Sequence, residues 1–153
     1  MHWLRRSGLS LFLLGLSLAP IAGRAQVGSP VGSPEASAMR VLDDFLAAYN
    51  ASDAKALVAT LQFPHVRIAG NTVKVFANPA EYLASLALEQ HGWDYASWVN
   101  RRVVQKSIDK VHVAARFARF RAGGVKVDEI DSFYVVILRN GRWGIMARSS
   151  LVD

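Results

Sequence analysis

The stretch DSFYVVILRNGRWGIMARS, residues 131–149, decides the fold class. Two apolar runs flank Asn140-Gly141, and an Asn-Gly pair between such runs is a strong signal of a two-residue β-hairpin. A two-residue loop sets four facing pairs: Leu138 with Trp143, Val136 with Ile145, Tyr134 with Ala147, and Phe133 with Arg148. Both faces of the hairpin are then largely apolar, so the sheet needs a cover on each face.

Strand patterns continue on the N-terminal side of this hairpin. Runs around residues 99–106 and 111–121 predict two more strands. Further upstream, FPHVRIAG (63–70) and TVKVFA (72–77) meet at Gly70-Asn71, which predicts another hairpin.

Three other segments have the apolar spacing of helices. The first begins at Pro34 with Ser33 as its cap, the second has Ser52 as its cap, and the third follows Asn78-Pro79 and ends near Gly92. Three helices cover only one face of the sheet well. We therefore expect a homodimer in which the second sheet face is buried.

The order helix, helix, hairpin, helix and long strands resembles the nuclear transport factor 2-like superfamily. The segments FLAAYNASDAKAL (45–57) and GRWGIMARSSL (141–151) are similar to the entry and exit segments of its SnoaL-like members, and the resemblance covers about residues 35–152. It implies an α+β, cystatin-like fold: a cone-shaped curved antiparallel sheet of about six strands, wrapped around three helices.

The resemblance implies a fold more specifically than a function, because the superfamily includes isomerases, dehydratases, cyclases and non-catalytic binding domains. Its ketosteroid isomerase-like members have an aromatic hydroxyl on the first helix, which Tyr49 matches. They also have a carboxylate base just after the first strand of the hairpin. Here that region reads Ile68-Ala69-Gly70-Asn71 without an acid, which argues against an isomerase of that type.

The N-terminal segment predicts the compartment. Residues 1–25 have a basic start, an apolar centre and a small-residue ending at Ala25, the pattern of a cleaved signal peptide. Residues 26–34 form a Gly-, Ser- and Pro-rich linker, and residues 35–153 form the domain. We expect a periplasmic or secreted protein with no stable membrane anchor after cleavage; an uncleaved anchor is the alternative.

Composition narrows the choice of partners. The chain has 18 basic and 12 acidic residues, and removal of Arg5, Arg6 and Arg24 with the N-terminal segment leaves a formal charge of only +3. We therefore expect no nucleic-acid partner. The chain has no cysteine, and its histidines lack HxH or HExxH spacing, so we expect neither a metal site nor a cofactor.

His65 is the best candidate acid–base group, because an imidazole exchanges protons near neutral pH. Tyr49 and Asp94 are the other catalytic candidates, as an oxyanion donor and as a group that orients His65. Arg67 shares the strand face of His65 and is a candidate anion ligand, with Phe63 as an apolar contact. In the structural alternative, His65 closes the mouth of the cone with one hydrogen bond and Arg67 is solvated.

Two further arginines are ligand candidates. Arg116 lies beside small alanines, and its alternative role is an ion pair with Asp128, Asp131 or Asp94. Arg148 lies in an apolar stripe and needs an anionic partner, either a ligand or a buried carboxylate. Tyr134, on the facing strand, is an expected ligand contact.

Trp93 and Trp98 lie in the segment after the third helix, where a cone-shaped pocket has its lid. They are candidates for holding an apolar ligand or, alternatively, for sealing the core. We interpret the chain as an exported small-molecule-binding domain with a largely apolar pocket gated by His65, Trp93 and Trp98. The alternatives are a cofactor-free lyase, cyclase or isomerase that uses His65, and an envelope protein-interaction domain.

Overall fold

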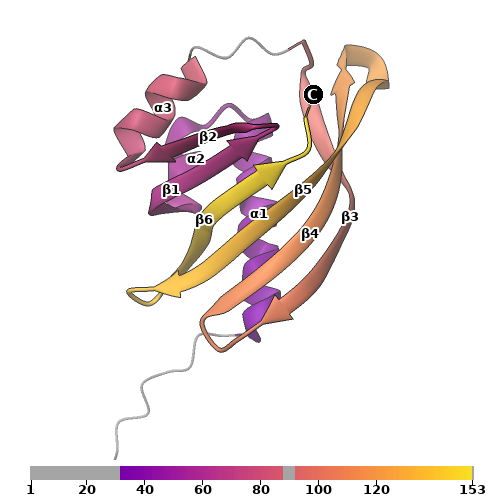
Figure 1. Ribbon diagram of the computed structural model, residues 1–153. Coiled ribbons are helices and arrows are strands. Elements are labelled where there is room, and N and C mark those ends of the chain that lie inside the picture. Colours follow the sequence, from indigo (N-terminus) through magenta and orange to yellow (C-terminus); the bar gives the residue numbers. More distant parts are fainter. Residues whose placement is uncertain (1–31, 88–91, 153) are drawn as a thin grey trace, which may run out of the picture.

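The computed structural model describes residues 32–87 and 92–152. The predicted signal peptide, residues 1–25, and most of the linker lie outside the described residues. Within them, one curved six-stranded sheet runs alongside a long helix (Figure 1). The α+β class, the six strands and the three helices confirm the predicted fold class.

The described elements follow the predicted order. The helices are α1 (Pro34–Asn50), α2 (Ala54–Ala59) and α3 (Pro79–Ala87). The strands are β1 (Leu61–Ala69), β2 (Thr72–Phe76), β3 (Tyr95–Lys106), β4 (Lys110–Arg121), β5 (Val125–Arg139) and β6 (Arg142–Ser150), and the short 3-10 turn η1 (Ala122–Gly124) joins β4 to β5. None of the described helices is long and apolar enough to cross a membrane.

The strand order is β2-β1-β6-β5-β4-β3. Four neighbouring pairs are antiparallel, as expected, whereas β1 and β6 are parallel because the C-terminal strand returns to the middle of the sheet. Near the Asn140-Gly141 turn the predicted register is confirmed, with Leu138 opposite Trp143 and Val136 opposite Ile145.

The predicted register fails beyond Val136. A bulge gives β6 one extra residue, so that Val135 faces Ala147 and Tyr134 faces Arg148. The predicted pairs of Tyr134 with Ala147 and of Phe133 with Arg148 are therefore wrong by one residue. Because strand side chains alternate between faces, this shift moves Arg148 to the inner face of the sheet.

The core lies between α1 and the inner face of the sheet. The buried stripe of α1 that packs there consists of Ala38, Leu42, Phe45 and Ala48. The predicted Ser33 cap is confirmed, since its hydroxyl accepts a hydrogen bond from the Ala36 N–H at 3.2 Å. The predicted Ser52 cap is wrong: Asp53 caps α2.

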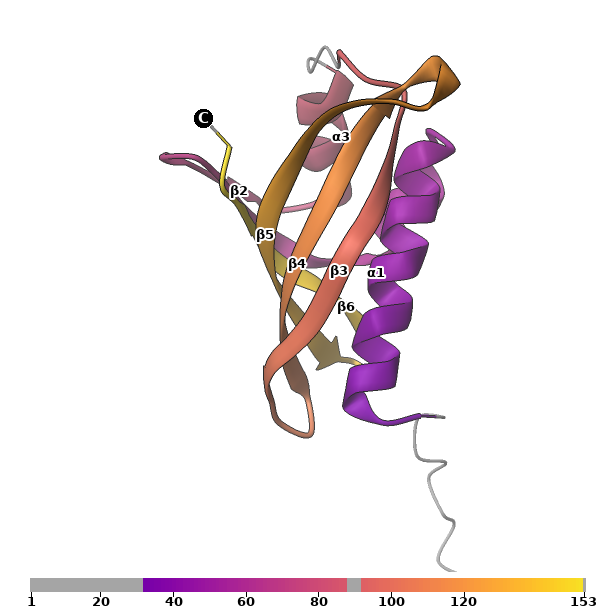
Figure 2. The same cartoon turned by 90° about the vertical axis from the view of Figure 1, so that its right-hand side faces the viewer.

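The outer face of the sheet carries no described helix over β4 and β5 (Figure 2). Apolar side chains on this face include Phe133, which is 36% exposed, and the β2 residues Val73 and Val75, which are 62% and 63% exposed. The strand pairing puts these residues on the same side of the sheet.

Candidate functional site

A cavity of about 100 Å³ lies between the C-terminal half of α1 and the inner face of the sheet. Helix α1 contributes Phe45 and Tyr49 to its wall, and β4 contributes Phe117. Ser150, the last residue of β6, and Val152 just beyond it also line the cavity, so it lies at this end of the strand.

Aromatic rings form most of the apolar wall. Tyr49 stacks on Trp93 with 5.5 Å between ring centroids. Trp98 makes edge contacts with Phe117 at 6.3 Å and with Tyr134 at 5.8 Å. Trp93, Trp98, Tyr49 and Tyr134 were all predicted as site residues, and the structure brings them together. Trp98 belongs to β3 rather than to the expected loop, so its position is set by the sheet.

Arg148 lies on the cavity wall among these rings. Its guanidinium carbon is 5.2 Å from the ring centroid of Phe117, 5.8 Å from that of Tyr134 and 5.9 Å from that of Phe45. Such contacts partly compensate a cation that is removed from water. The Arg148 Nε–H also donates to the Ser150 hydroxyl at 3.1 Å.

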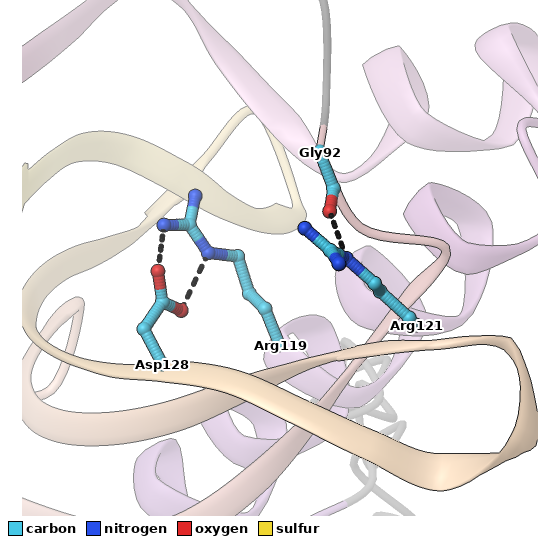
Figure 3. Close-up of polar contacts among 4 residues, drawn as sticks. All are labelled: Gly92, Arg119, Arg121 and Asp128. Atoms are coloured by element: carbon cyan, nitrogen blue, oxygen red, sulfur yellow. Dashed lines mark hydrogen bonds and ion pairs between the residues drawn. The ribbon is translucent and has the colours of Figure 1, made fainter.

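Arg119 is the second cation of the wall, and it has a carboxylate partner. Its guanidinium binds Asp128 through two hydrogen bonds, one of them from Nε at 2.7 Å (Figure 3). The pair raises the pKa of Arg119 and lowers the pKa of Asp128. Near the Arg119–Asp128 pair, the Nε–H of Arg121 donates to the carbonyl oxygen of Gly92 at 3.3 Å (Figure 3). This hydrogen bond connects β4 to the residue before Trp93.

Arg67 lines the same cavity from β1 and is the register partner of Arg148 on β6. Two arginines therefore occupy neighbouring strands on one face. Among the described residues that line the cavity, none is an aspartate or a glutamate. The wall thus combines aromatic rings with positive charge.

Tyr134 is 1% exposed, and burial raises the pKa of its hydroxyl, while the positive charge of Arg148 and a hydrogen bond with Ser132 oppose that rise. The hydroxyls of Ser132 and Ser150 lie 2.8 Å apart. Tyr134, Ser132, Ser150 and Arg148 therefore form a continuous polar patch on the inner face.

His65 lies elsewhere, in the core between β1 and α3. It is 2% exposed, and its ring packs against Tyr82 at 5.3 Å and Phe76 at 6.4 Å. The Nδ1 atom lies 3.0 Å from the Ile145 carbonyl oxygen, so Nδ1 carries the proton in the neutral ring. Burial lowers the pKa of His65 to about 4. One hydrogen bond holds the ring, as in the structural alternative, but His65 lies in the core and neither lines the cavity nor closes its mouth.

Three other predicted site residues are absent from the described wall of the cavity. Asp94 accepts a hydrogen bond from the Ala122 N–H at 2.6 Å, an interaction that does not involve His65. Phe63 packs at the edge of the main core. Arg116 lies on the outer face and binds Asp131 through two hydrogen bonds of 2.8 Å, which is one of the ion pairs considered from the sequence.

Arg119, Ser150 and Phe45 also line the cavity, although they were not among the site residues predicted from the sequence. The alternation of β4 places Arg119 on the same face as Phe117, which was a usable signal. The described residues contain no group of three or more His, Cys, Asp or Glu side chains that could hold a metal ion.

The comparisons with solved structures show the fold. A protein from Nostoc punctiforme with a cystatin-like fold matches at 16% identity and a TM-score of 0.64, over 78% of this chain and 90% of that one. A ketosteroid isomerase-like protein from Erwinia carotovora matches at 20% identity and a TM-score of 0.60, over 76% and 93%. An NTF2-like protein from Cytophaga hutchinsonii matches at 13% identity and a TM-score of 0.64, over 80% and 100%.

No curated protein matches the chain by sequence. A family model described as NTF2-like protein (DUF6841) matches residues 35–150. This span runs from the first turn of α1 to the last residue of β6, which confirms the resemblance to the nuclear transport factor 2-like superfamily. The chain belongs to the NTF2-like family DUF6841.

Proposed function

We propose that this chain is an exported domain that binds a small organic molecule in the cavity between α1 and the sheet. The composition of the cavity wall supports this proposal most directly, because aromatic rings and the polar groups of three arginines and Ser150 line it together. Small-molecule sites typically have this composition, with an apolar lining for affinity and few polar groups for orientation. The N-terminal pattern of residues 1–25 supports export.

The geometry favours binding over acid–base catalysis. Among the described residues of the wall, the titratable side chains are arginines and the tyrosines Tyr49 and Tyr134. Arginine stays protonated, and burial raises the pKa of Tyr134, so neither is a suitable base near neutral pH. His65 and Asp94 have other hydrogen-bond partners and do not line the cavity.

Native mass spectrometry of the protein, purified gently without added ligand, tests this proposal. We expect the chain to begin at Gln26 and to carry a small additional mass. Ala69 lines the cavity, so Ala69→Leu fills part of the space and should remove the additional mass. Ala47→Leu is the matched control, because Ala47 lies exposed on α1 and is not among the wall residues.

If both variants keep the additional mass, the molecule is bound outside the cavity and the proposal fails. A bare wild-type protein that also shows no thermal stabilisation by a panel of small organic molecules would contradict it as well.

A further inference from the structure

Arg148 is a cation without a protein counter-ion in the described part of the chain. No carboxylate of residues 32–87 or 92–152 pairs with it, although its neighbour Arg119 is paired with Asp128. A charge that is partly removed from water needs a partner or a compensating set of hydrogen bonds. Arg148 therefore has an electrostatic requirement that the described chain itself does not meet.

The hydrogen bonds of Arg148 are also incomplete. A guanidinium has five N–H donors, and the Nε–H of Arg148 donates to Ser150. The four N–H groups on the two terminal nitrogens have no acceptor among the described residues. This fork of parallel donors has the geometry that binds both oxygens of a carboxylate.

Further positive charge lines the cavity near Arg148. Arg67 is its register partner on β1 and lines the same cavity. The field of Arg148 reaches into the core: after burial, its positive charge contributes to the lowered pKa of His65, and it opposes the rise that burial causes in the pKa of Tyr134. An anion in the cavity would be attracted by the charge of Arg148.

The size and the wall of the cavity limit what that anion is. About 100 Å³ is small compared with the roughly 300–1,000 Å³ of pockets that hold drug-sized ligands. The rings of Phe45, Phe117 and Tyr134 surround the guanidinium and offer apolar faces to the rest of the ligand. A compact acid with a flat or short apolar body fits this wall better than a fully hydrated inorganic anion.

We propose that the cavity binds a small organic acid whose carboxylate pairs with the guanidinium of Arg148, while its apolar body packs against the aromatic wall. The inference rests on the proposed small-molecule function and adds the chemical class of the ligand. The Ser150 hydroxyl, which accepts from Arg148 Nε, orients the guanidinium fork.

Titration calorimetry of the purified full chain with benzoate tests the inference, with benzamide and inorganic phosphate as comparison probes. Benzamide keeps the ring and removes the charge, and phosphate keeps the charge and removes the ring. We expect benzoate to bind at least tenfold more tightly than either. Equal affinities for benzoate and benzamide would contradict a role for the carboxylate charge in binding. Tighter binding of phosphate than of benzoate would contradict the proposal that the ligand is an organic acid.

Arg148→Gln should weaken benzoate binding at least tenfold, because charge-assisted hydrogen bonds are lost. Arg102→Gln removes the same charge from an exposed position of β3 outside the cavity wall, and it should bind benzoate like the wild type. Circular dichroism establishes that both variants are folded. Wild-type affinity in Arg148→Gln would contradict the inference.

Failure of this inference differs from failure of the proposed function. One outcome is that benzoate does not bind while native mass spectrometry finds a neutral molecule that Ala69→Leu removes. In that case the cavity is a small-molecule site, but its ligand is not an organic acid. If neither experiment detects a ligand in the cavity, both proposals fail.

Discussion

Arg148 lies directly opposite Tyr134 across the β5–β6 pair, and this pairing places a cation on the inner face of the sheet. The pairing depends on the bulge at Met146, which gives β6 one extra residue between Ile145 and Ala147. Without the bulge, Met146 would pair with Val135, and the alternation of the strand would carry Arg148 to a position opposite Phe133 on the outer face.

A partly buried cation without a carboxylate partner is expected to lower stability. Arg148→Met removes the charge and leaves a shorter, unbranched apolar side chain that packs well against aromatic rings. We expect the free energy of unfolding in urea to rise by about 1–2 kcal/mol. Arg102→Met, on the exposed surface of β3, should change it by less than about 0.5 kcal/mol. A decrease in Arg148→Met would show that Arg148 stabilises the fold.

The fold could be predicted from the sequence because its signals are local. The turn Asn140-Gly141 and the alternation of residues around it fixed the register of the first pairs of the last hairpin. The shift at Met146 has no equivalent signal, since a bulge is decided by how both strands pack on α1. The side of Arg148 was therefore predicted incorrectly, although its need for an anion follows from the sequence.

The prediction of site residues failed for a similar reason. His65 and Arg67 share a strand face, as expected, but only Arg67 lines the cavity. Helix α3 covers the position of His65, where Tyr82 packs against its ring. Strand alternation shows which face of the sheet a residue occupies. It does not show which part of that face a helix covers, because this depends on the tertiary packing.

The pKa of His65 predicts a loss of stability in mild acid. The unfolded chain takes up a proton on this residue near pH 6.5, whereas the folded protein resists protonation to about pH 4. Stability from this group is therefore complete above pH 6.5 and falls as the pH drops toward 4, by roughly 3 kcal/mol in total. Urea unfolding between pH 7.5 and 4.5 measures this dependence.

His65→Phe removes the titrating group and keeps a ring among Phe76 and Tyr82. It also leaves the Ile145 carbonyl oxygen without its partner, so the variant should be less stable than the wild type at pH 7.5. Its stability should depend less on pH over the same range. An unchanged dependence would assign the acid sensitivity to other groups.

Both the backbone conformation at position 70 and the atoms around it favour glycine there. Its φ is +55°, and a Cβ atom would lie 2.8 Å from the carbonyl oxygen of Val152, which is on the cavity wall. We expect Gly70→Ala to lower the free energy of unfolding by about 2 kcal/mol or more. Gly141→Ala has a similar φ of +74° without a neighbour within 4 Å, so it should cost only about 1 kcal/mol. Equal losses would mean that Val152 moves aside freely.

The outer face of the sheet predicts a homodimer. Val66, Ile68, Val135 and Phe133 form an apolar surface that no described helix covers. We expect sedimentation equilibrium to give a dimer and Phe133→Glu to give a monomer. Ile108→Glu is the control, because Ile108 is 85% exposed in the β3–β4 turn and away from this surface. A wild-type monomer at tens of micromolar would contradict the prediction.

Asp128 neutralises Arg119 at the cavity wall, so Asp128→Asn should free a second guanidinium for an anionic ligand. We expect benzoate to bind several-fold more tightly to this variant. The loss of stability should stay below about 1 kcal/mol, because both side chains of the pair are partly exposed.

Asp131→Asn is the matched control for Asp128→Asn. It makes the same substitution in the pair of Arg116 with Asp131, which lies on the outer face. Long-range electrostatics alone would raise the benzoate affinity of both variants, and that rise would disappear at high salt. An increase confined to Asp128→Asn, and retained in high salt, would place the anion beside Arg119 and inside the cavity.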